Sequence, residues 1–439
     1  MHTLAQLERG ELAGTTRLDL SAGLETFPNA IFELADSLEV LNLSGNHLSS
    51  LPDDLSRLHK LRILFCSDNL FTEVPASIGR CANLEMVGFK ANRIRHLPAE
   101  ALPLKLRWLI LTDNQLEAVP DQIGRCAHLQ KLMLAGNQLQ ALPETLANCH
   151  SLELLRIAAN RLPALPEWLL SMPRLSWLAF AGNPFSDEME AQTLTQHPLP
   201  PIKREHISLL EVLGQGASGV IHRADWREPG QPPRAMAAKL FKGNLTSDGL
   251  PHSEMAACIA AGEHPNLVRV AGPLANRVDE LPGLLMELID PSYDVLAGPP
   301  SLASCTRDCY APERRFSAGE VLRIAKATAS AINHLHQRGI LHGDLYAHNL
   351  LVDPNGQTLL SDFGAASFFD PETPRGQALI RLESRAFGYL LDELLARCDL
   401  AKQDERLRQL AIMKQNCLVE DPGERPMFDL LAEKLASIR

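Results

Sequence analysis

Residues 15–185 repeat one arrangement of leucines separated by polar positions. Each unit follows the frame L-x-x-L-x-L-x-x-N, as in Leu38, Leu41, Leu43 and Asn46. The asparagine returns after 22 or 23 residues each time, at Asn46, Asn69, Asn92, Asn114, Asn137, Asn160 and Asn183. A proline keeps the same period, at Pro28, Pro52, Pro75, Pro98, Pro120, Pro143 and Pro166. Two interlocked registers predict a solenoid in which each unit contributes one short strand, with alternate leucines pointing into a shared core.

This pattern resembles the leucine-rich repeat of the subtype that has an LPxxI/L segment after the asparagine. The asparagine side chain can satisfy backbone groups where the chain turns away from the strand, so its repetition predicts a hydrogen-bonded ladder through the stack. The first unit has Gly23 at the asparagine position, and Asn183-Pro184-Phe185 leads into polar and acidic residues. We therefore expect atypical capping units at both ends.

The strand positions that alternate with the buried leucines should line the concave face of the solenoid, where function is expected. That face is unusually apolar for a surface in water. It includes Phe65, Trp108, Ile110, Met133 and Trp177. A contiguous apolar strip with two tryptophans is typical of a protein-binding surface, although flanking side chains can cover part of it. The partner could be another protein or the second domain of the same chain.

The repeat register stops in a segment with several prolines among polar residues. We place the repeat domain at residues 1–190, a linker at 191–204 and a second domain at 205–439. The second domain opens with the glycine-rich turn Gly214-Gln215-Gly216-Ala217-Ser218-Gly219 between two apolar runs. A dinucleotide site needs a helix directly after such glycines, whereas the residues that follow here read as strands.

Four further signals follow the glycine-rich turn in order. They are Glu254 ahead of His264-Pro265-Asn266-Leu267-Val268, then His342-Gly343-Asp344-Leu345-Tyr346-Ala347-His348-Asn349, then Ser361-Asp362-Phe363-Gly364, and finally the segment Cys417 to Pro426. Each signal alone is common, but their ordered combination resembles the protein kinase family over residues 205–439. The whole chain is therefore predicted to be an α/β leucine-rich-repeat solenoid followed by a two-lobed α+β protein-kinase-like domain.

The resemblance implies ATP and Mg²⁺ as cofactors and assigns roles to individual residues. The residues implied in catalysis are Asp344, Lys239 and Glu254. Those implied in nucleotide binding are Leu213, Gly214, Gly216, Gly219, Ile221, Ala237, Lys239, Met286, Glu287, Ile289 and Leu351. Asn349 and Asp362 are implied as the metal ligands, because hard oxygen ligands suit Mg²⁺.

The second domain also departs from the kinase pattern near the implied catalytic residue. Gly343 stands where many regulated kinases have arginine, so activation by loop phosphorylation is not expected. Tyr346 and His348 stand where lysine or arginine is common, which predicts less positive charge near the transferred phosphate. Glu383, which we take as the start of the next large helix, follows Asp362 by only 21 residues with no A-P-E motif between them. The usual platform for a peptide substrate is therefore expected to be short or absent.

Three functions stay open on these observations. The first is an active protein kinase, acting on serine or threonine rather than tyrosine, whose repeats recruit a partner or regulate the kinase. The second is a small-molecule kinase of the aminoglycoside or choline phosphotransferase type, because H-G-D-L-x-x-x-N is also the loop of those enzymes. The third is a pseudokinase scaffold in which the repeats are the functional part.

The amino-acid composition bears on the binding partners and the cellular location of the protein, and not on its chemistry. The chain has 42 Lys and Arg against 53 Asp and Glu, a net charge of −11, which argues against a nucleic-acid-binding face. No apolar run is long enough for a membrane helix. Nine cysteines scattered over 439 residues predict reduced thiols rather than a disulfide framework, so we expect a cytoplasmic protein. Cys81, Cys126 and Cys149 share one repeat position and are expected to be small buried hydrophobic side chains.

Overall fold

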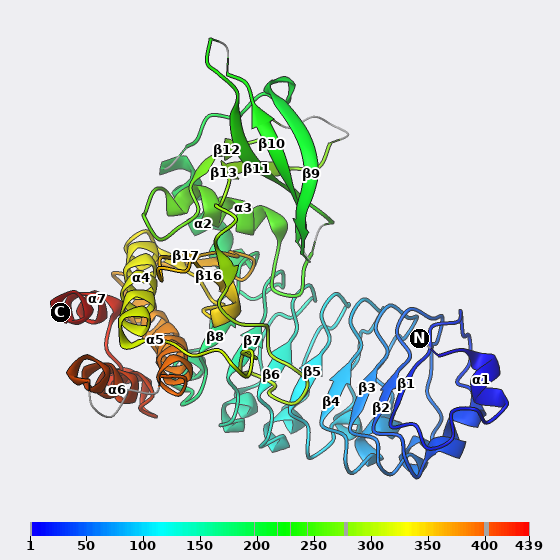
Figure 1. Ribbon diagram of the computed structural model, residues 1–439. Coiled ribbons are helices and arrows are strands. Elements are labelled where there is room, and N and C mark those ends of the chain that lie inside the picture. Colours follow the sequence, from blue (N-terminus) through cyan, green and yellow to red (C-terminus); the bar gives the residue numbers. More distant parts are fainter. Residues whose placement is uncertain are drawn as a thin grey trace. The chain divides into compact units, whose positions relative to one another are not determined.

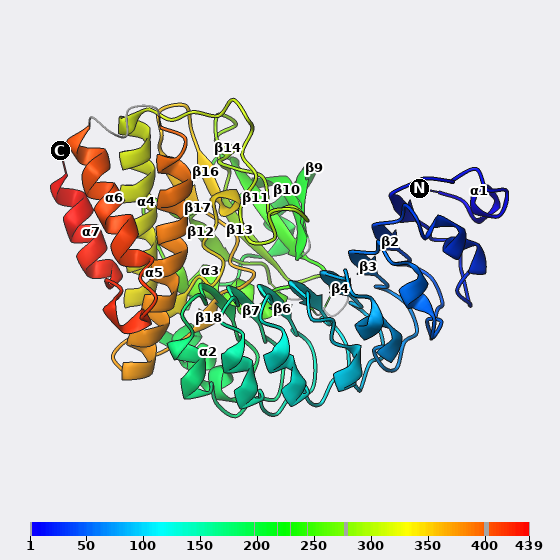
Figure 2. The same ribbon diagram turned by 90° about the horizontal axis from the view of Figure 1, so that it is seen from below.

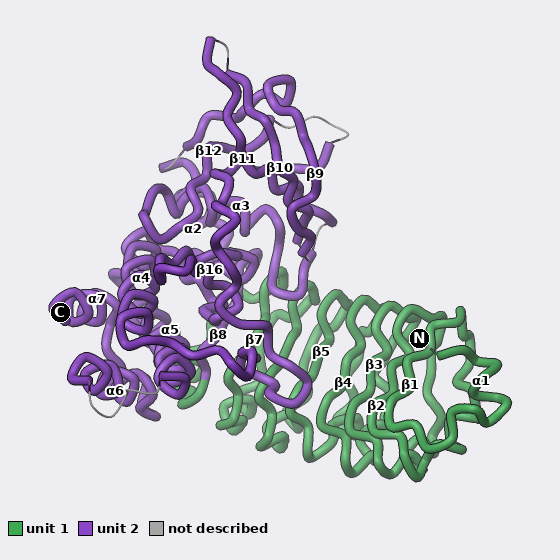
Figure 3. Tube along the Cα trace, viewed as in Figure 1, with its two compact units in different colours: residues 1–174 green, residues 175–439 purple. Residues whose placement is uncertain are grey.

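The structure of the protein is a computed structural model that describes residues 2–196, 198–216, 218–228, 230–243, 245–275, 280–398 and 404–438. The chain divides into two compact units, residues 1–174 (unit 1) and residues 175–439 (unit 2) (Figure 3). In the described part of the chain, no helix is both long and apolar enough to cross a membrane.

Unit 1 is a row of parallel strands joined by short 3₁₀ helices (Figure 1). After helix α1 (Leu4–Glu8), the strands are β1 (Arg17–Asp19), β2 (Val40–Asn42), β3 (Ile63–Phe65), β4 (Met86–Gly88), β5 (Trp108–Ile110), β6 (Lys131–Met133) and β7 (Leu154–Arg156). The 3₁₀ helices are Asn29–Leu34, Leu55–Arg57, Ala76–Arg80, Ala99–Ala101, Asp121–Arg125, Glu144–Asn148 and Glu167–Ser171. Equivalent residues pair across neighbouring strands, as Leu41 does with Leu64, and these leucines are fully buried. The predicted solenoid is confirmed.

The repeated asparagines form the predicted ladder. The Asn137 Oδ1 accepts a hydrogen bond from the Leu116 backbone N–H at 2.9 Å, and its Nδ2 donates to the carbonyls of Leu111 and Leu134 at 2.9 and 3.0 Å. Asn114 and Asn160 bond their own neighbours in the same way. Each asparagine therefore connects two successive repeats through backbone groups that no longer contact water.

Replacing Asn137 with alanine should destabilise unit 1 by roughly 3 kcal/mol or more, because three backbone groups lose their partner and each unsatisfied buried group costs roughly 1–3 kcal/mol. Urea unfolding of the full chain measures the effect. The matched control is Asn148→Ala, since Asn148 is exposed and its loss should change the free energy of unfolding by less than about 0.5 kcal/mol. Equal losses in the two variants would contradict the ladder.

The repeat cysteines are buried thiols, as predicted. Cys81, Cys126 and Cys149 expose 3%, 1% and 0% of their surface. Burial raises the pKa of the Cys81 and Cys126 thiols to about 11, so they stay protonated and unreactive. All nine cysteines of the chain are free thiols.

Unit 2 begins with the last repeat strand, β8 (Trp177–Ala179), and helix α2 (Pro184–Gln196). A five-stranded antiparallel sheet follows, in the order β12-β13-β11-β10-β9. Its strands are β9 (Ile207–Gln215), β10 (Gly219–Trp226), β11 (Arg234–Phe241), β12 (Val270–Pro273) and β13 (Gly283–Glu287), and helix α3 (Pro251–Ala261) lies between β11 and β12 in sequence. This sheet and α3 form the first of the two predicted lobes.

The second lobe of unit 2 is mainly helical. Helices α4 (Ala318–Gln337), α5 (Pro374–Leu395), α6 (Glu405–Cys417) and α7 (Phe428–Ser437) lie side by side (Figure 2). Short strands complete the lobe: β14 (Asp294–Val295) with β16 (Leu350–Val352) and β17 (Thr358–Leu360), and β15 (Ile340–Leu341) with β18 (Ser367–Phe368). The remaining 3₁₀ helices are Arg204–His206, Ala347–Asn349 and Pro422–Glu424. The predicted two-lobed α+β architecture is confirmed.

The segment 191–204, which we expected to be a linker, belongs to unit 2 and contacts its apolar core. Helix α2 runs through Gln196, and Leu194 and Leu199 contact the apolar cluster around Phe241. Further along, the Ile202 backbone N–H donates to the Pro273 carbonyl at 2.8 Å. The compact units divide between Arg174 and Leu175, ahead of the boundary that the prolines suggested. The apolar side chains in this stretch are too few to give a helical period, so composition alone favours a linker.

Candidate active site

The glycine-rich turn joins β9 to β10 as a hairpin. Gln215 pairs with Val220, and the Gly216 backbone N–H donates to the Gly219 carbonyl at 2.9 Å. A Cβ on Gly219 would lie 2.4 Å from the Leu240 carbonyl oxygen, so packing requires glycine there. A Cβ on Gly214 or Gly216 would meet no atom within 4 Å. The turn therefore leaves open space beside its backbone, which suits a bound phosphate chain; Ala217 of the predicted turn lies outside the described residues.

Lys239 and Glu254 form a buried ion pair between β11 and α3. The Lys239 ammonium donates to Glu254 Oε1, and the two side chains are 14% and 2% exposed. Burial alone would lower the pKa of Lys239, but the carboxylates of Glu254 and Asp362 outweigh it and hold the pKa above its ordinary value. Lys239 is therefore a fixed cation, opposite Ile221 of β10.

The residues predicted to line a nucleotide pocket come from both lobes. Ala237 is buried on β11 and pairs with Met286 of β13, and Met286 packs against the apolar cluster around Phe241. Leu213 is 49% exposed on β9, and Leu351 is half-buried on β16 in the other lobe. Glu287 is the last residue of β13, and Ile289 lies in the connection after it. Both line a cavity of about 490 Å³ together with Glu263, His264, Pro265, Leu267, Val268 and Arg269.

Asp344 and Asn349 are joined directly in the loop His342–Asn349, which we call the catalytic loop. The Asn349 Nδ2 donates to the Asp344 backbone carbonyl at 2.9 Å and to its Oδ2 at 2.8 Å. Asn349 is buried, whereas the Asp344 side chain is 17% exposed. This arrangement leaves the Asp344 carboxylate fixed in direction and within reach of solvent.

Asp362 is held next to Asn349 through the residue before it. The Ser361 backbone N–H and hydroxyl both donate to the Asn349 carbonyl, at 2.9 and 3.0 Å. Asp362 has a left-handed backbone, with φ of 57°, and its Oδ1 accepts from the Gly364 N–H at 3.0 Å. Asn349 and Asp362 thus carry hard oxygen atoms on two hydrogen-bonded segments, the ligand type that Mg²⁺ prefers, and the residues present fit the implied metal.

A buried carboxylate that the sequence did not reveal anchors the start of the catalytic loop. Glu383 of α5 is 1% exposed, accepts from the Gly343 N–H at 2.7 Å and contacts the His336 Nε2 at 2.6 Å. Burial would raise the pKa of Glu383, but the His336 contact and the donors of the loop outweigh it and lower the pKa. The available signal was a single acidic residue among the apolar positions of a helix.

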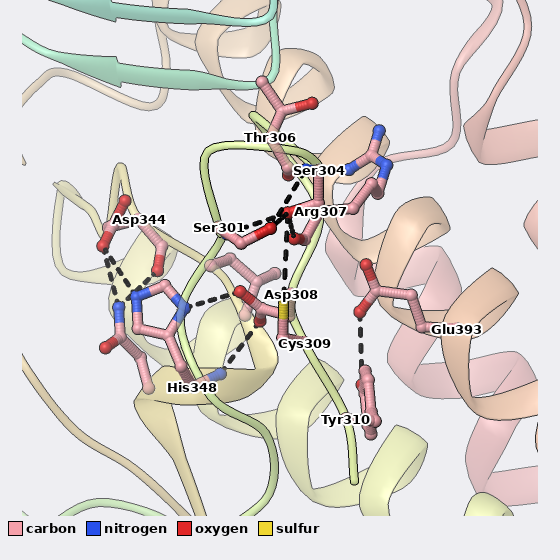
Figure 4. Close-up of polar contacts among 12 residues, drawn as sticks. Ser301, Ser304, Thr306, Arg307, Asp308, Cys309, Tyr310, Asp344, His348 and Glu393 are labelled. Carbon is pink, nitrogen blue, oxygen red and sulfur yellow. Dashed lines mark hydrogen bonds and ion pairs between the residues drawn. The ribbon is translucent and has the colours of Figure 1, made fainter. Parts of the chain in front are cut away.

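His348 is paired with an aspartate from a distant loop (Figure 4). Its Nδ1 lies 2.8 Å from Asp308 Oδ1, its backbone N–H donates to Asp308 Oδ2 at 3.0 Å, and its Nε2 lies 3.9 Å from Asp344 Oδ2. Burial opposes the charged imidazole, but Asp308 and Asp344 outweigh it and raise the pKa of His348. The raised pKa favours the charged form of His348 beside Asp344, where the sequence suggested a loss of positive charge.

The connection from Asp362 to the next helix is even shorter than expected. Helix α5 begins at Pro374 and not at Glu383, because Thr373 caps its first turn by accepting from the Gly376 N–H at 3.0 Å. Gly343 has φ of 72°, and a Cβ there would lie 2.7 Å from the carbonyl oxygens of Ala365 and Leu178. An arginine at this position would therefore collide with the backbone.

The predicted partner strip divides between the two units. Phe65, Trp108, Ile110 and Met133 are half-buried on the strands of unit 1. Trp177 is 1% exposed in unit 2, where its indole N–H donates to the Leu345 carbonyl at 2.9 Å. The prediction that Trp177 presents itself to another protein is wrong, since it contacts the chain's own catalytic loop, the other alternative that the sequence left open.

Comparison with known proteins supports the assignment of both halves of the chain, the repeats and the kinase domain. Residues 207–382 match the family described as protein tyrosine and serine/threonine kinase, and residues 36–94 and 104–162 match leucine-rich-repeat families. A probable serine/threonine-protein kinase of Arabidopsis thaliana is 36% identical over 113 residues, which cover 26% of this chain and 18% of that protein. A second such kinase of Arabidopsis thaliana is 26% identical over 214 residues, covering 46% of this chain and 28% of its own length.

A further relative, the ephrin type-B receptor 4 of Mus musculus, is 26% identical over 166 residues, which cover 38% of this chain and 16% of the receptor. The chain thus spans less than a third of the length of each of these curated relatives.

Proposed function

The chain joins leucine-rich repeats to a protein kinase domain, and from this premise we propose that it transfers the γ-phosphate of Mg-ATP to a hydroxyl group of a protein. One observation carries the proposal: unit 2 contains both the buried Lys239–Glu254 ion pair and the hydrogen-bonded Asp344–Asn349 pair. These two pairs meet the two requirements of phosphoryl transfer, a fixed cation for the phosphates and a directed carboxylate for the acceptor.

The residues of the site have separate tasks in this proposal. Bound Mg-ATP supplies a phosphoryl group whose charge is partly neutralised. Lys239, held by Glu254, binds the phosphates, and the open backbone of the glycine-rich turn covers them. Asn349 and Asp362 hold the metal. Asp344 orients the acceptor hydroxyl and takes its proton, since its carboxylate is fixed by Asn349 yet accessible.

We further propose serine or threonine as the acceptor and unit 1 as a recruiting domain. Two relatives named as probable serine/threonine-protein kinases support the acceptor type. The apolar strip of Phe65, Trp108, Ile110 and Met133 supports partner binding by the repeats, because partly exposed aromatic and aliphatic side chains in one strip commonly mark an interface. The nine free cysteines support a cytoplasmic location, where thiols stay reduced.

The test is phosphorylation of a generic protein substrate and of a cell extract by the full chain with Mg-ATP, compared with Asp344→Asn. The variant should lose at least about a hundredfold in rate, because general-base catalysis by a positioned side chain is worth that much or more. Asp36→Asn is the control, since the Asp36 side chain is fully exposed in unit 1 and its loss should change nothing.

Two results would replace this proposal with its alternatives. Phosphorylation of a small metabolite but of no polypeptide would favour a small-molecule kinase, an outcome that the short segment 363–373 makes worth testing. Absence of thermal stabilisation by Mg-ATP would favour a pseudokinase scaffold, because a ligand that binds the native state must stabilise it.

A further inference from the structure

The catalytic loop is contacted by two segments that lie far from it in sequence. One is strand β8, the last repeat strand, which contributes Trp177. The other is the segment Ser301–Tyr310, which precedes α4 and contributes Asp308 (Figure 4). Both belong to unit 2, and both contact loop residues that lie between Asp344 and Asn349.

Trp177 fixes the middle of the catalytic loop. Its indole N–H donates to the Leu345 carbonyl at 2.9 Å, and its ring stacks on Tyr346 with centroids 4.2 Å apart and planes inclined by 7°. Trp177 also stacks on Tyr389 of α5 at 5.5 Å. The indole N–H and the stacked ring of Trp177 together constrain both the direction and the rotation of the peptide that follows Asp344.

Asp308 fixes the far end of the loop. Its side chain is fully buried and accepts from the His348 backbone N–H at 3.0 Å, with the other oxygen 2.8 Å from the His348 ring. Arg307, the preceding residue, lies with its guanidinium 3.2 Å from the ring centroid of Tyr389 and 5.2 Å from that of Trp177. The two anchors are therefore linked to each other through Arg307.

The segment between Asp362 and α5, which lies next to the catalytic loop, is short. Only residues 363–373 separate Asp362 from α5, and the Leu178 carbonyl of β8 lies where a side chain on Gly343 would have to pass. The backbone of the last repeat thus takes up space beside the catalytic loop that a longer segment after Asp362 could otherwise fill.

We propose that Trp177 and Asp308 are positioning residues for phosphoryl transfer, holding Asp344 and Asn349 in their working geometry through their contacts with Leu345, Tyr346 and His348. This inference rests on the proposed kinase activity. Its consequence is that the repeat array ends inside the catalytic unit, so a change at the last repeat strand acts on the transfer step.

Kinetics of full-chain variants test the proposal. Trp177→Leu and Asp308→Asn should each lower kcat by about ten- to a hundredfold, because small displacements of a catalytic group have effects of that size. The KM for ATP should change much less than kcat, since Lys239, Glu254 and the glycine-rich turn lie outside the catalytic loop, and only Asn349 of the groups that bind Mg-ATP lies within it. Trp177→Phe keeps a stacking ring without the N–H donor and should fall between wild type and Trp177→Leu.

Trp168→Phe is the matched control, because Trp168 lies in the last 3₁₀ helix of unit 1, away from the apolar strip. All assays are run below the melting temperature of each variant, which calorimetry gives. A parallel rise in KM and fall in kcat, or no change in either, would overturn the positioning role.

Hydrogen exchange of the backbone amides of residues 343–349 separates this inference from the proposed function. Exchange should be faster in Trp177→Leu and Asp308→Asn than in wild type and Trp168→Phe, while Asp344→Asn keeps the wild-type anchors. If wild type itself transfers no phosphate, the kinase proposal fails, and this exchange measurement still decides whether the anchors hold the loop. Unchanged exchange rates in both Trp177→Leu and Asp308→Asn would refute the proposal that Trp177 and Asp308 hold the loop.

Discussion

Replacing Lys239 with methionine is expected to lower kcat/KM for ATP-dependent phosphorylation by about a hundred- to a thousandfold, the usual cost of removing one fixed group that stabilises developing charge. Methionine keeps the length and apolar stem of the side chain but not the charge. The loss also leaves Glu254 buried without its cation, because the two side chains are only 14% and 2% exposed. Steady-state kinetics on a protein substrate, with titration calorimetry of ATP, measures both effects.

The control for this prediction is Lys203→Met, because the Lys203 side chain is 70% exposed and outside the site. A double-mutant cycle with Glu254→Gln sharpens the test. If the pair acts as one unit, the double variant should lose little more than Lys239→Met alone, since neighbouring groups that share an interaction are not additive. Retention of more than a tenth of the wild-type activity in Lys239→Met would contradict the role given to this residue.

The repeat half of the molecule is predictable from sequence because its structure is locally determined. Leu41 meets Leu64 and Asn137 bonds Leu116 and Leu134, contacts that recur with the same spacing in each repeat. A period of 22 or 23 residues therefore specifies the strand register and the buried ladder together. No information from elsewhere in the chain is needed to infer these contacts.

The burial of Trp177 could not be predicted from the repeat pattern. Its place in the repeat frame is the same as that of Trp108, so the pattern assigns both to one exposed strip. They differ because Trp177 meets Leu345, which lies 168 residues further along the chain. A repeat pattern describes the neighbours above and below in the stack and carries no information about such a distant contact.

In the kinase half too, motifs identify some of the site residues, whereas others are recognised only from their tertiary contacts. The sequence motifs identified Lys239, Glu254, Asp344 and Asn349 as site residues, and the structure pairs Lys239 with Glu254 and Asp344 with Asn349. Glu383 and Asp308 lie in segments without a motif, and their importance comes from burial against the catalytic loop. The predicted start of the helix at Glu383 was wrong, because Thr373 and Pro374, which are ordinary helix-start residues, begin α5 at a place that no kinase motif marks.

Removing the carboxylate of Glu383 is expected to be the most destabilising single change in unit 2. Glu383→Ala breaks the contact with His336 and the hydrogen bond from the Gly343 N–H, both fully buried, and loss of one partner from a buried pair costs about 3–5 kcal/mol. Calorimetry of the full chain should show a lower melting temperature for the unit 2 transition, with little change in that of unit 1. Glu372→Ala, an exposed glutamate just before α5, should leave both transitions in place.

The pH dependence gives an independent check on the Glu383 prediction. The fold lowers the pKa of Glu383 below its ordinary value, so its stabilising contribution is fully present above the unfolded-state pKa of about 4.3. That contribution is lost as the pH falls through the lower folded-state pKa. The free energies of unfolding of wild type and Glu383→Gln should therefore differ most near neutral pH and converge in acid. A difference that persists unchanged to the acid limit would show that packing, and not the buried charge, stabilises this part of the catalytic loop.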